Sequence, residues 1–171
     1  EGATAVDSNV AIADADSGDS NTCNLGGADS GLFACTLSGQ TAYSIAFSSA
    51  PDYETPNSAA GSNEYAVTVT INDGSNNGAT ISYTVTVDDA NDQTPVYQAA
   101  DSDDAITVNE NVGTGSIDAG TITDTDTVGT LACTLGGADA ADFACTISGT
   151  NANLAFAVNP DFENPADADS N

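Results

Sequence analysis

The sequence predicts an all-β chain of two tandem antiparallel β-sandwiches, the second of them incomplete. Three observations support this fold class. Apolar residues recur with a period of two, Gly, Asn and Asp separate the short apolar runs, and a stretch of about 110 residues repeats. A period of two is typical of half-buried strands, and several short strands per 110 residues are typical of a sandwich.

The clearest alternation lies in residues 65–71 and 79–87, where apolar side chains alternate with Ala, Thr and Ser. Asn72-Asp73-Gly74 begins the turn between them, so these two runs predict a hairpin. Single helical turns are expected at 27–32 and 137–142. Four further strands are expected around Tyr43, Ile45 and Phe47; Leu131, Cys133 and Leu135; Phe143, Cys145 and Ile147; and Leu154, Phe156 and Val158.

The repeat is visible as identical or nearly identical sequence segments at offsets of 109 and 110 residues. Residues 25–29 (Leu-Gly-Gly-Ala-Asp) return as 135–139, and residues 51–54 (Pro-Asp-Tyr-Glu) return as 160–163 with Phe for Tyr. We expect a first repeat at 1–88 whose first strand is missing or partial, a linker at 89–95, and a second repeat at 96–171 without its last strands. Two explanations stay open: a window from a longer array, or a neighbouring chain that supplies the missing strands.

The chain has no Lys, Arg or His, and 26 acidic residues give a formal charge of -26. Such a compact chain repels itself unless it binds cations or lies in high salt. Disorder is a poor explanation, because 40% of residues are apolar and they alternate. Nucleic acid and membrane surfaces are poor partners, since both need basic residues on the protein. No stretch of this segment is apolar enough to insert into a membrane.

The four cysteines form two pairs with the same twelve-residue gap, Cys23 with Cys35 and Cys133 with Cys145. Each falls on the inward face of a predicted strand. We expect one disulfide in each repeat, which indicates an oxidising, extracellular or cell-surface location. Buried free thiols are the alternative. A catalytic thiol is less expected, because no His or Lys is present to lower its pKa.

Four of the five Glu residues occupy positions fixed by the repeat: Glu1, Glu54, Glu110 and Glu163. An acidic linker at 88–95 joins the repeats and ends in Pro. Carboxylate, amide and backbone oxygens in such clusters suit Ca²⁺, which takes six to eight oxygen ligands. Mg²⁺ needs a stricter octahedron and is less suited to joining two domains.

These elements together resemble the repeats of the cadherin family over the whole chain. Residues 89–95 (Asp-Ala-Asn-Asp-Gln-Thr-Pro) resemble the family's DxNDNxP linker, with Gln93 for the second Asn. The motif ending at Glu54 and its copy ending at Glu163 resemble LDRE, Asn109-Glu110-Asn111 resembles PEN, and residues 14–16 and 124–126 resemble DxD. The sequence segments at 25–29 and 160–167 are most similar to cadherin-like repeats of bacterial surface proteins. The resemblance implies Greek-key sandwiches with Ca²⁺ at their ends.

The resemblance also implies a ligand set. The inter-repeat site would use Glu1, Asp52, Glu54, Asp89, Asn91, Asp92, the Gln93 carbonyl, Asp124 and Asp126. A site with a preceding repeat would use Asp14, Asp16 and Asp73, and a site with a following repeat would use Glu110, Asp161 and Glu163.

Other readings of the acidic residues are possible. Asp commonly closes turns by binding its own backbone, and we favour this role for Asp29, Asp139, Asp101, Asp103 and Asp104. Asp167 and Asp169 are expected to be solvated loop residues, with an extra ion site as the alternative. A glycosidase carboxylate pair is disfavoured, because the acids repeat with the fold.

The sequence therefore predicts a non-enzymatic, calcium-rigidified extracellular module of a structural filament, stalk or sheath. Neighbouring repeats of the same protein, in a homopolymer or a longer array, are the expected partners. An adhesin that mediates calcium-dependent adhesion and an accessory domain of a secreted enzyme are the alternatives.

Overall fold

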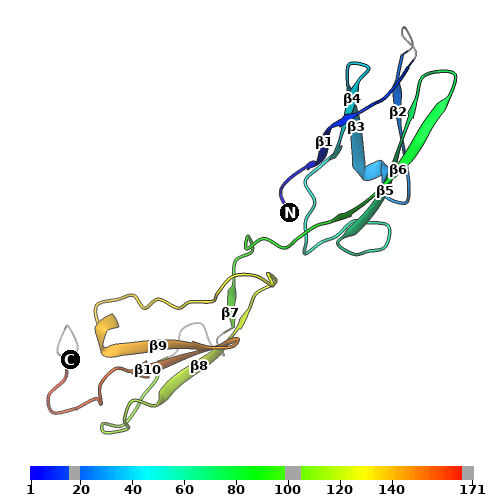
Figure 1. Ribbon diagram of the computed structural model, residues 1–171. Coiled ribbons are helices and arrows are strands. Elements are labelled where there is room, and N and C mark those ends of the chain that lie inside the picture. The colour runs from blue at the N-terminus through cyan, green and yellow to red at the C-terminus, as the bar shows by residue number, and fades with distance from the viewer. Residues whose placement is uncertain (16–19, 99–104, 167–171) are drawn as a thin grey trace. The chain divides into compact units, whose positions relative to one another are not determined.

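The computed structural model describes residues 1–15, 20–98 and 105–166 (Figure 1). The chain divides into two compact units, Glu1–Ala90 (unit 1) and Asn91–Asn171 (unit 2). Strands and loops make up nearly all of the described residues, and the helices among them are single 3-10 turns. None of these helices has the length and hydropathy needed to cross a membrane. The predicted all-β class is confirmed.

Unit 1 is a sandwich of two antiparallel sheets with three strands each. One sheet has the order β1-β4-β3 and the other the order β2-β5-β6. A 3-10 turn, η1, precedes β3, as the sequence predicts. The elements are β1 (Ala5–Ala11), β2 (Thr22–Gly26), η1 (Ser30–Leu32), β3 (Phe33–Ser38), β4 (Ala42–Phe47), β5 (Glu64–Asn72) and β6 (Asn77–Thr86).

The core of unit 1 lies between these sheets and comes mainly from β4 and β5. Alternate residues of β5 are buried, and Tyr65 is fully inaccessible to solvent. Its ring meets Phe47 edge-on at 5.1 Å, while Phe33 stacks on Phe47 at 4.4 Å. The alternation predicted for 65–71 is thus confirmed. The run at 79–87 is buried only toward its end, because Ile81 lies on an edge strand and remains 41% exposed.

Side-chain links join the sheets of unit 1. A disulfide connects Cys23 on β2 to Cys35 on β3. Farther along the sandwich, the Tyr43 hydroxyl of β4 lies 2.8 Å from the Tyr83 hydroxyl of β6. The predicted disulfide is therefore present, and it bridges the two layers rather than two neighbours within one sheet.

Unit 2 contains one described sheet of order β7-β8-β10-β9, with a 3-10 turn, η2, before β9. Pairing is antiparallel throughout. The second predicted disulfide is also present, between Cys133 and Cys145. The elements are β7 (Val96–Gln98), β8 (Ser116–Thr123), η2 (Ala140–Asp142), β9 (Phe143–Ser148) and β10 (Asn151–Phe156).

Two strand predictions in unit 2 are wrong. Residues 131–135 form no strand, although they repeat the sequence of β2. In unit 1 that strand pairs only with β5, and the described part of unit 2 offers residues 131–135 no such partner. Val158 was expected on the strand with Leu154, but β10 ends at Phe156 and Val158 is 59% exposed.

Candidate metal centres

Three carboxylates meet at one end of unit 1. One oxygen from each of Glu1, Glu54 and Asp89 lies within 4.8 Å of the others, and all three residues are half-buried. Glu1 precedes β1, Glu54 lies in the loop from β4 to β5, and Asp89 follows β6. Antiparallel order brings these segments to the same end of the sandwich, so the fold itself gathers the charges.

Backbone groups hold Glu1 in this cluster. The Tyr53 N–H donates to Glu1 Oε2, and the Glu1 nitrogen donates to the Asp88 carbonyl at 2.8 Å. The other carboxylate oxygen, Oε1, is buried and has no hydrogen-bond partner among the described residues. Burying such an oxygen is costly without a donor or cation. Because the chain has no Lys, Arg or His, a bound cation is the natural partner.

Two neighbours shape this end of unit 1 without belonging to the cluster. The Asp52 Oδ1 accepts from the Thr55 N–H at 2.8 Å, which closes the turn that presents Glu54. Asn63 was missed by the sequence analysis. Its side-chain Nδ2 donates to the Tyr53 carbonyl at 3.0 Å, and its backbone carbonyl oxygen accepts from the Val87 N–H at 2.9 Å. Asn63 thereby ties the loop of Glu54 to the strand that leads into Asp89, and no sequence motif marks it.

A second cluster forms in unit 2 from Glu110, Asp161 and Glu163, whose oxygens also lie within 4.8 Å of one another. These residues are exposed. The Phe162 N–H donates to Glu110 Oε2 at 3.3 Å, and the Asn164 N–H donates to Asp161 Oδ1 at 3.2 Å. The structure therefore brings together the three acids assigned to a following repeat.

The same hydrogen bonds hold the loop and the first Glu of both clusters, 109 residues apart. In each unit the residue before the last Glu of the motif donates its N–H to the first Glu, Glu1 or Glu110. In each, the motif's Asp accepts from the N–H three residues later. A backbone hydrogen bond to the carbonyl oxygen of the motif's Pro also recurs, and its donor is the N–H of the residue after the first Glu. Glu1 thus occupies the position equivalent to Glu110.

The acidic linker is divided between the units: Asp89 belongs to unit 1, while Asn91, Asp92 and Gln93 begin unit 2. Within unit 2, the Gln93 N–H donates to Asp126 Oδ2 at 2.9 Å, and its side chain donates to Asp92 Oδ1 at 2.7 Å. The Asp126 N–H donates to Asp124 Oδ1 at 3.2 Å. Within unit 2, Gln93 therefore links Asp92 to the second DxD.

The ligands expected for a preceding repeat are not assembled among the described residues. Asp16 lies outside them, and neither Asp14 nor Asp73 belongs to an acidic cluster there. Asp73 Oδ1 accepts from the N–H groups of Ser75 and Asn76 at 2.7 and 2.6 Å. These two bonds lower the pKa of Asp73, and the bond from Asn76 has the larger effect. In the structure this carboxylate closes the β5–β6 turn.

Asp29 does more than close a local turn. It is 5% exposed, and its two oxygens accept from the N–H groups of Ala59 and Ala66 at 2.6 Å each. This buried carboxylate joins η1 to the loop before β5 and to β5 itself. Its copy, Asp139, is only half-buried. The other acids expected in turns or loops, Asp101, Asp103, Asp104, Asp167 and Asp169, lie outside the described residues.

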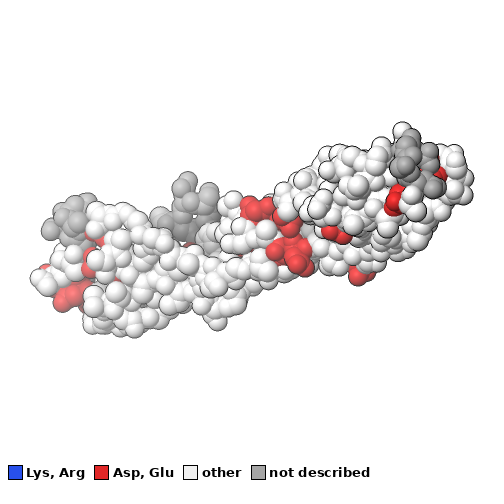
Figure 2. Space-filling model, turned by 45° about the horizontal axis from the view of Figure 1, so that its top comes forward, with Lys and Arg blue, Asp and Glu red and all other residues white. Residues whose placement is uncertain are grey.

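The chemistry of both clusters fits Ca²⁺. Their ligand atoms are hard carboxylate oxygens, without nitrogen or sulfur. Ca²⁺ binds oxygen at about 2.3–2.6 Å, so two ligand atoms on one ion are at most about 5 Å apart. The carboxylate oxygens of each cluster lie within 4.8 Å of one another, so a single ion can contact all three. Figure 2 shows some acidic side chains in patches and others lying singly, with uncharged surface between them. The clusters can bind a cation electrostatically.

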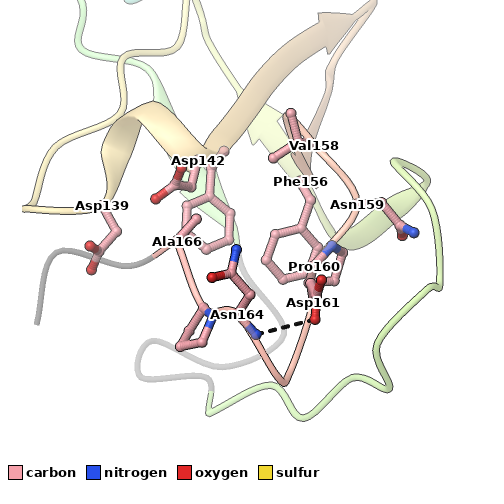
Figure 3. A pocket seen from close by; sticks show the side chains of 11 residues that line it. Asp139, Asp142, Phe156, Val158, Asn159, Pro160, Asp161, Asn164 and Ala166 are labelled. Carbon is pink, nitrogen blue, oxygen red and sulfur yellow. Dashed lines mark hydrogen bonds between the residues drawn. The ribbon is translucent and has the colours of Figure 1, made fainter. Parts of the chain in front are cut away.

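One described hollow lies against the sheet of unit 2. It is a cavity of about 410 Å³ in unit 2, lined by the stacked rings of Phe143 and Phe156 and by the loop at 158–166 (Figure 3). The equivalent rings in unit 1, Phe33 and Phe47, are covered by Tyr65. Among the described residues, no third aromatic ring packs against the Phe143–Phe156 pair. The cavity is therefore an uncovered piece of core.

Comparisons with known proteins support the fold. The sequence matches no protein-family model and no curated protein. The structure is similar to the crystal structure of human protocadherin-24 EC1-2 (form II), with a TM-score of 0.56 and 19% identity over 90% of this chain and 68% of that chain. A second similar structure is the protocadherin GammaB4 extracellular domain, with a TM-score of 0.48 and 22% identity over 84% of this chain and 22% of that one. The fold is thus that of cadherin extracellular domains. The bacterial type stays a prediction.

Proposed function

We propose that this chain is a calcium-binding extracellular repeat module that forms part of a structural filament, stalk or sheath. The observation that carries the proposal is the duplicated acidic cluster. Glu1 and Glu54 of the first cluster recur as Glu110 and Glu163 of the second at an offset of 109 residues, and the same backbone hydrogen bonds hold the loops that carry them. The two disulfides support an oxidising compartment.

Calcium would act here by neutralising charge. With a formal charge of -26, the free chain repels itself, and the repulsion is strongest where three carboxylates converge. Bound Ca²⁺ removes that repulsion and links the loops that carry the ligands. In an array, ions at the ends of the repeats would hold successive repeats in a fixed orientation, which suits a load-bearing or spacing role.

Calcium binding is tested by calorimetric titration and by melting curves with and without a chelator. We expect Glu54→Gln and Glu163→Gln each to weaken Ca²⁺ binding about tenfold, which corresponds to about 1.4 kcal/mol. Glu64→Gln is the matched control, because Glu64 is the one Glu outside the repeated positions. The melting temperature should fall on adding chelator. An unchanged melting transition would refute the calcium proposal.

Electron microscopy of the native material tests the structural role. Ordered polymers with a spacing of one or two repeats would support a filament or sheath. Isolated thin rods ending in a separate binding domain would instead support an adhesin and contradict the filament assignment.

A further inference from the structure

The sequence contains a single Asn-Gly pair, Asn77-Gly78, and it lies at the start of β6. An asparagine side chain can close into a five-membered imide with the backbone nitrogen of the next residue. Glycine favours this ring closure, because it has no side chain to obstruct the approach and its backbone is the most adaptable. Asn77 is exposed, so water reaches it. The outcome therefore depends on how the hairpin of β5 and β6 holds the two residues.

The fold favours a glycine at position 78. A Cβ there would lie 3.2 Å from the backbone carbonyl oxygen of Ile71 on β5, so a larger residue would press on the neighbouring strand. The register between β5 and β6 also shifts beside Gly78. At such a bulge the ladder is locally interrupted and one residue is left unpaired. The hairpin thus keeps a residue without a side chain after Asn77, in backbone that is less constrained than a regular ladder.

A second asparagine contacts the side-chain carbonyl that reacts in this ring closure. The Asn72 Nδ2 donates to Asn77 Oδ1 at 2.6 Å. Asn72 is half-buried and is itself held in place, because its Oδ1 accepts from the Gly74 N–H at 2.7 Å. When a nucleophile adds to the amide carbon of Asn77, negative charge develops on Oδ1. A donor already placed on that oxygen stabilises the charge, as in an oxyanion hole.

We infer that Asn77 is a site of self-modification, at which the Gly78 nitrogen attacks the Asn77 side-chain amide and Asn72 is the oxyanion donor. A bond forms between the Gly78 nitrogen and Asn77 Cγ, and the bond from Cγ to Nδ2 breaks. The amide proton of Gly78 leaves with Nδ2 as ammonia. Water then opens the cyclic imide at one of its two carbonyls and gives aspartate or isoaspartate. All three residues belong to one hairpin, so the reaction depends on neither the bound cation nor the proposed assembly.

The modification changes both the charge and the backbone of the hairpin. Each event replaces a neutral amide with a carboxylate, in a chain that already has a formal charge of -26 and no Lys, Arg or His. The isoaspartate product also adds a methylene group to the main chain between Asn77 and Gly78. A long-lived copy of the chain would therefore gain negative charge with age at this hairpin.

The experiment incubates the whole 171-residue chain with saturating Ca²⁺ at neutral pH and follows deamidation over time by peptide mass spectrometry. A chymotrypsin-like protease cuts after Tyr65 and Tyr83, so both exposed asparagines of the turn lie in one peptide. Electron-transfer fragmentation distinguishes isoaspartate from aspartate. Asn77 should deamidate about tenfold faster than Asn76, which is followed by Asn, and this ratio corresponds to about 1.4 kcal/mol in activation free energy. Equal rates at the two residues would overturn the inference.

Asn72→Asp tests the oxyanion donor. The variant keeps an oxygen to accept from the Gly74 N–H but loses the donor to Asn77, so deamidation there should slow about tenfold. Asn24→Asp adds the same charge at an exposed residue of β2 and should react like the parent chain. If Asn72 only stiffened the hairpin, its loss would accelerate ring closure, so an unchanged or faster rate in Asn72→Asp would overturn its role. The comparison within the parent chain needs no variant and stays decisive if Asn72→Asp does not fold.

Discussion

The hydroxyl of Tyr43 lies 2.8 Å from the hydroxyl of Tyr83, and this contact joins the two sheets of unit 1. Tyr83 also donates to Asp7 Oδ2 at 3.3 Å on β1. Burial is the main cause that raises the pKa of Tyr83. The Tyr43 hydroxyl raises it further, and Asp7 has the smallest effect. The protonated phenol is therefore the form that the fold maintains.

Stability should consequently decline at high pH. An unfolded Tyr ionises near pH 10, whereas the raised pKa keeps Tyr83 protonated in the folded chain. The unfolded state then binds fewer protons, and the free energy of unfolding falls as the pH rises above about 10. Tyr83→Phe should cost about 1 kcal/mol at pH 8 and should show a shallower decline above pH 10. Urea unfolding at both pH values measures this. An equal decline in the parent and Tyr83→Phe would contradict it, and Tyr97→Phe is the exposed control.

The two buried bonds of Asp29 should make it a major contributor to unit 1. Asp29→Ala leaves the N–H groups of Ala59 and Ala66 without their acceptor. Hydrogen bonds to a charged group contribute about 1.5–3 kcal/mol each in mutational series, so we expect a loss of several kcal/mol in chemical denaturation. Asp139→Ala, at the half-buried copy, should cost much less. Equal losses for the two variants would show that the two buried hydrogen bonds of Asp29 add no stability.

Gly27 and its copy Gly137 offer a second matched pair. Both have positive φ, +93° and +103°. A Cβ at Gly27 would lie 2.8 Å from the Ala66 carbonyl oxygen, whereas one at Gly137 meets nothing within 4 Å. Both Ala variants suffer the backbone strain of about 1 kcal/mol, but Gly27→Ala must also displace a neighbouring strand. Melting should show the larger loss for Gly27→Ala, and a larger loss for Gly137→Ala would contradict this reading.

The disulfides should have different local effects when removed. Each closes a loop with a sequence separation of 12, for which chain entropy gives about 3 kcal/mol. Cys133→Ala with Cys145→Ala should also speed amide exchange at 131–135, which lack a strand partner in the described part of unit 2. Cys23→Ala with Cys35→Ala leaves β2 paired with β5, so β2 should stay protected. Exchange measured by mass spectrometry tests this contrast.

The parts of the fold that the sequence could predict are those where burial alternates strictly. β5 could be predicted because every second side chain at its start is buried in the core. β1 and β8 were missed: β1 has two register shifts, β8 has one, and Asp7 and Asp118 interrupt their apolar pattern. The strand expected at 131–135 failed for the opposite reason, since its pattern was right but its partner was not among the described residues.

The acidic clusters were predictable because their motifs repeat, and both groups of three acids contain only residues expected from the sequence. Asn63 and the long-range bonds of Asp29 were not predictable. Each connects segments whose proximity depends on the finished sandwich, and the residue types, Asn and Asp, are equally common in simple turns.

The disulfide between β2 and β3 also changes how the chain would respond to pulling. Tension that reached Cys23 would pass through the sulfur bridge to Cys35 and bypass the residues between them. With a sequence separation of 12, the bridge withholds roughly 40 Å of contour length at about 3.3–3.6 Å per residue. Each repeat would therefore extend less before its remaining strands carry load, as expected of a stiff mechanical element.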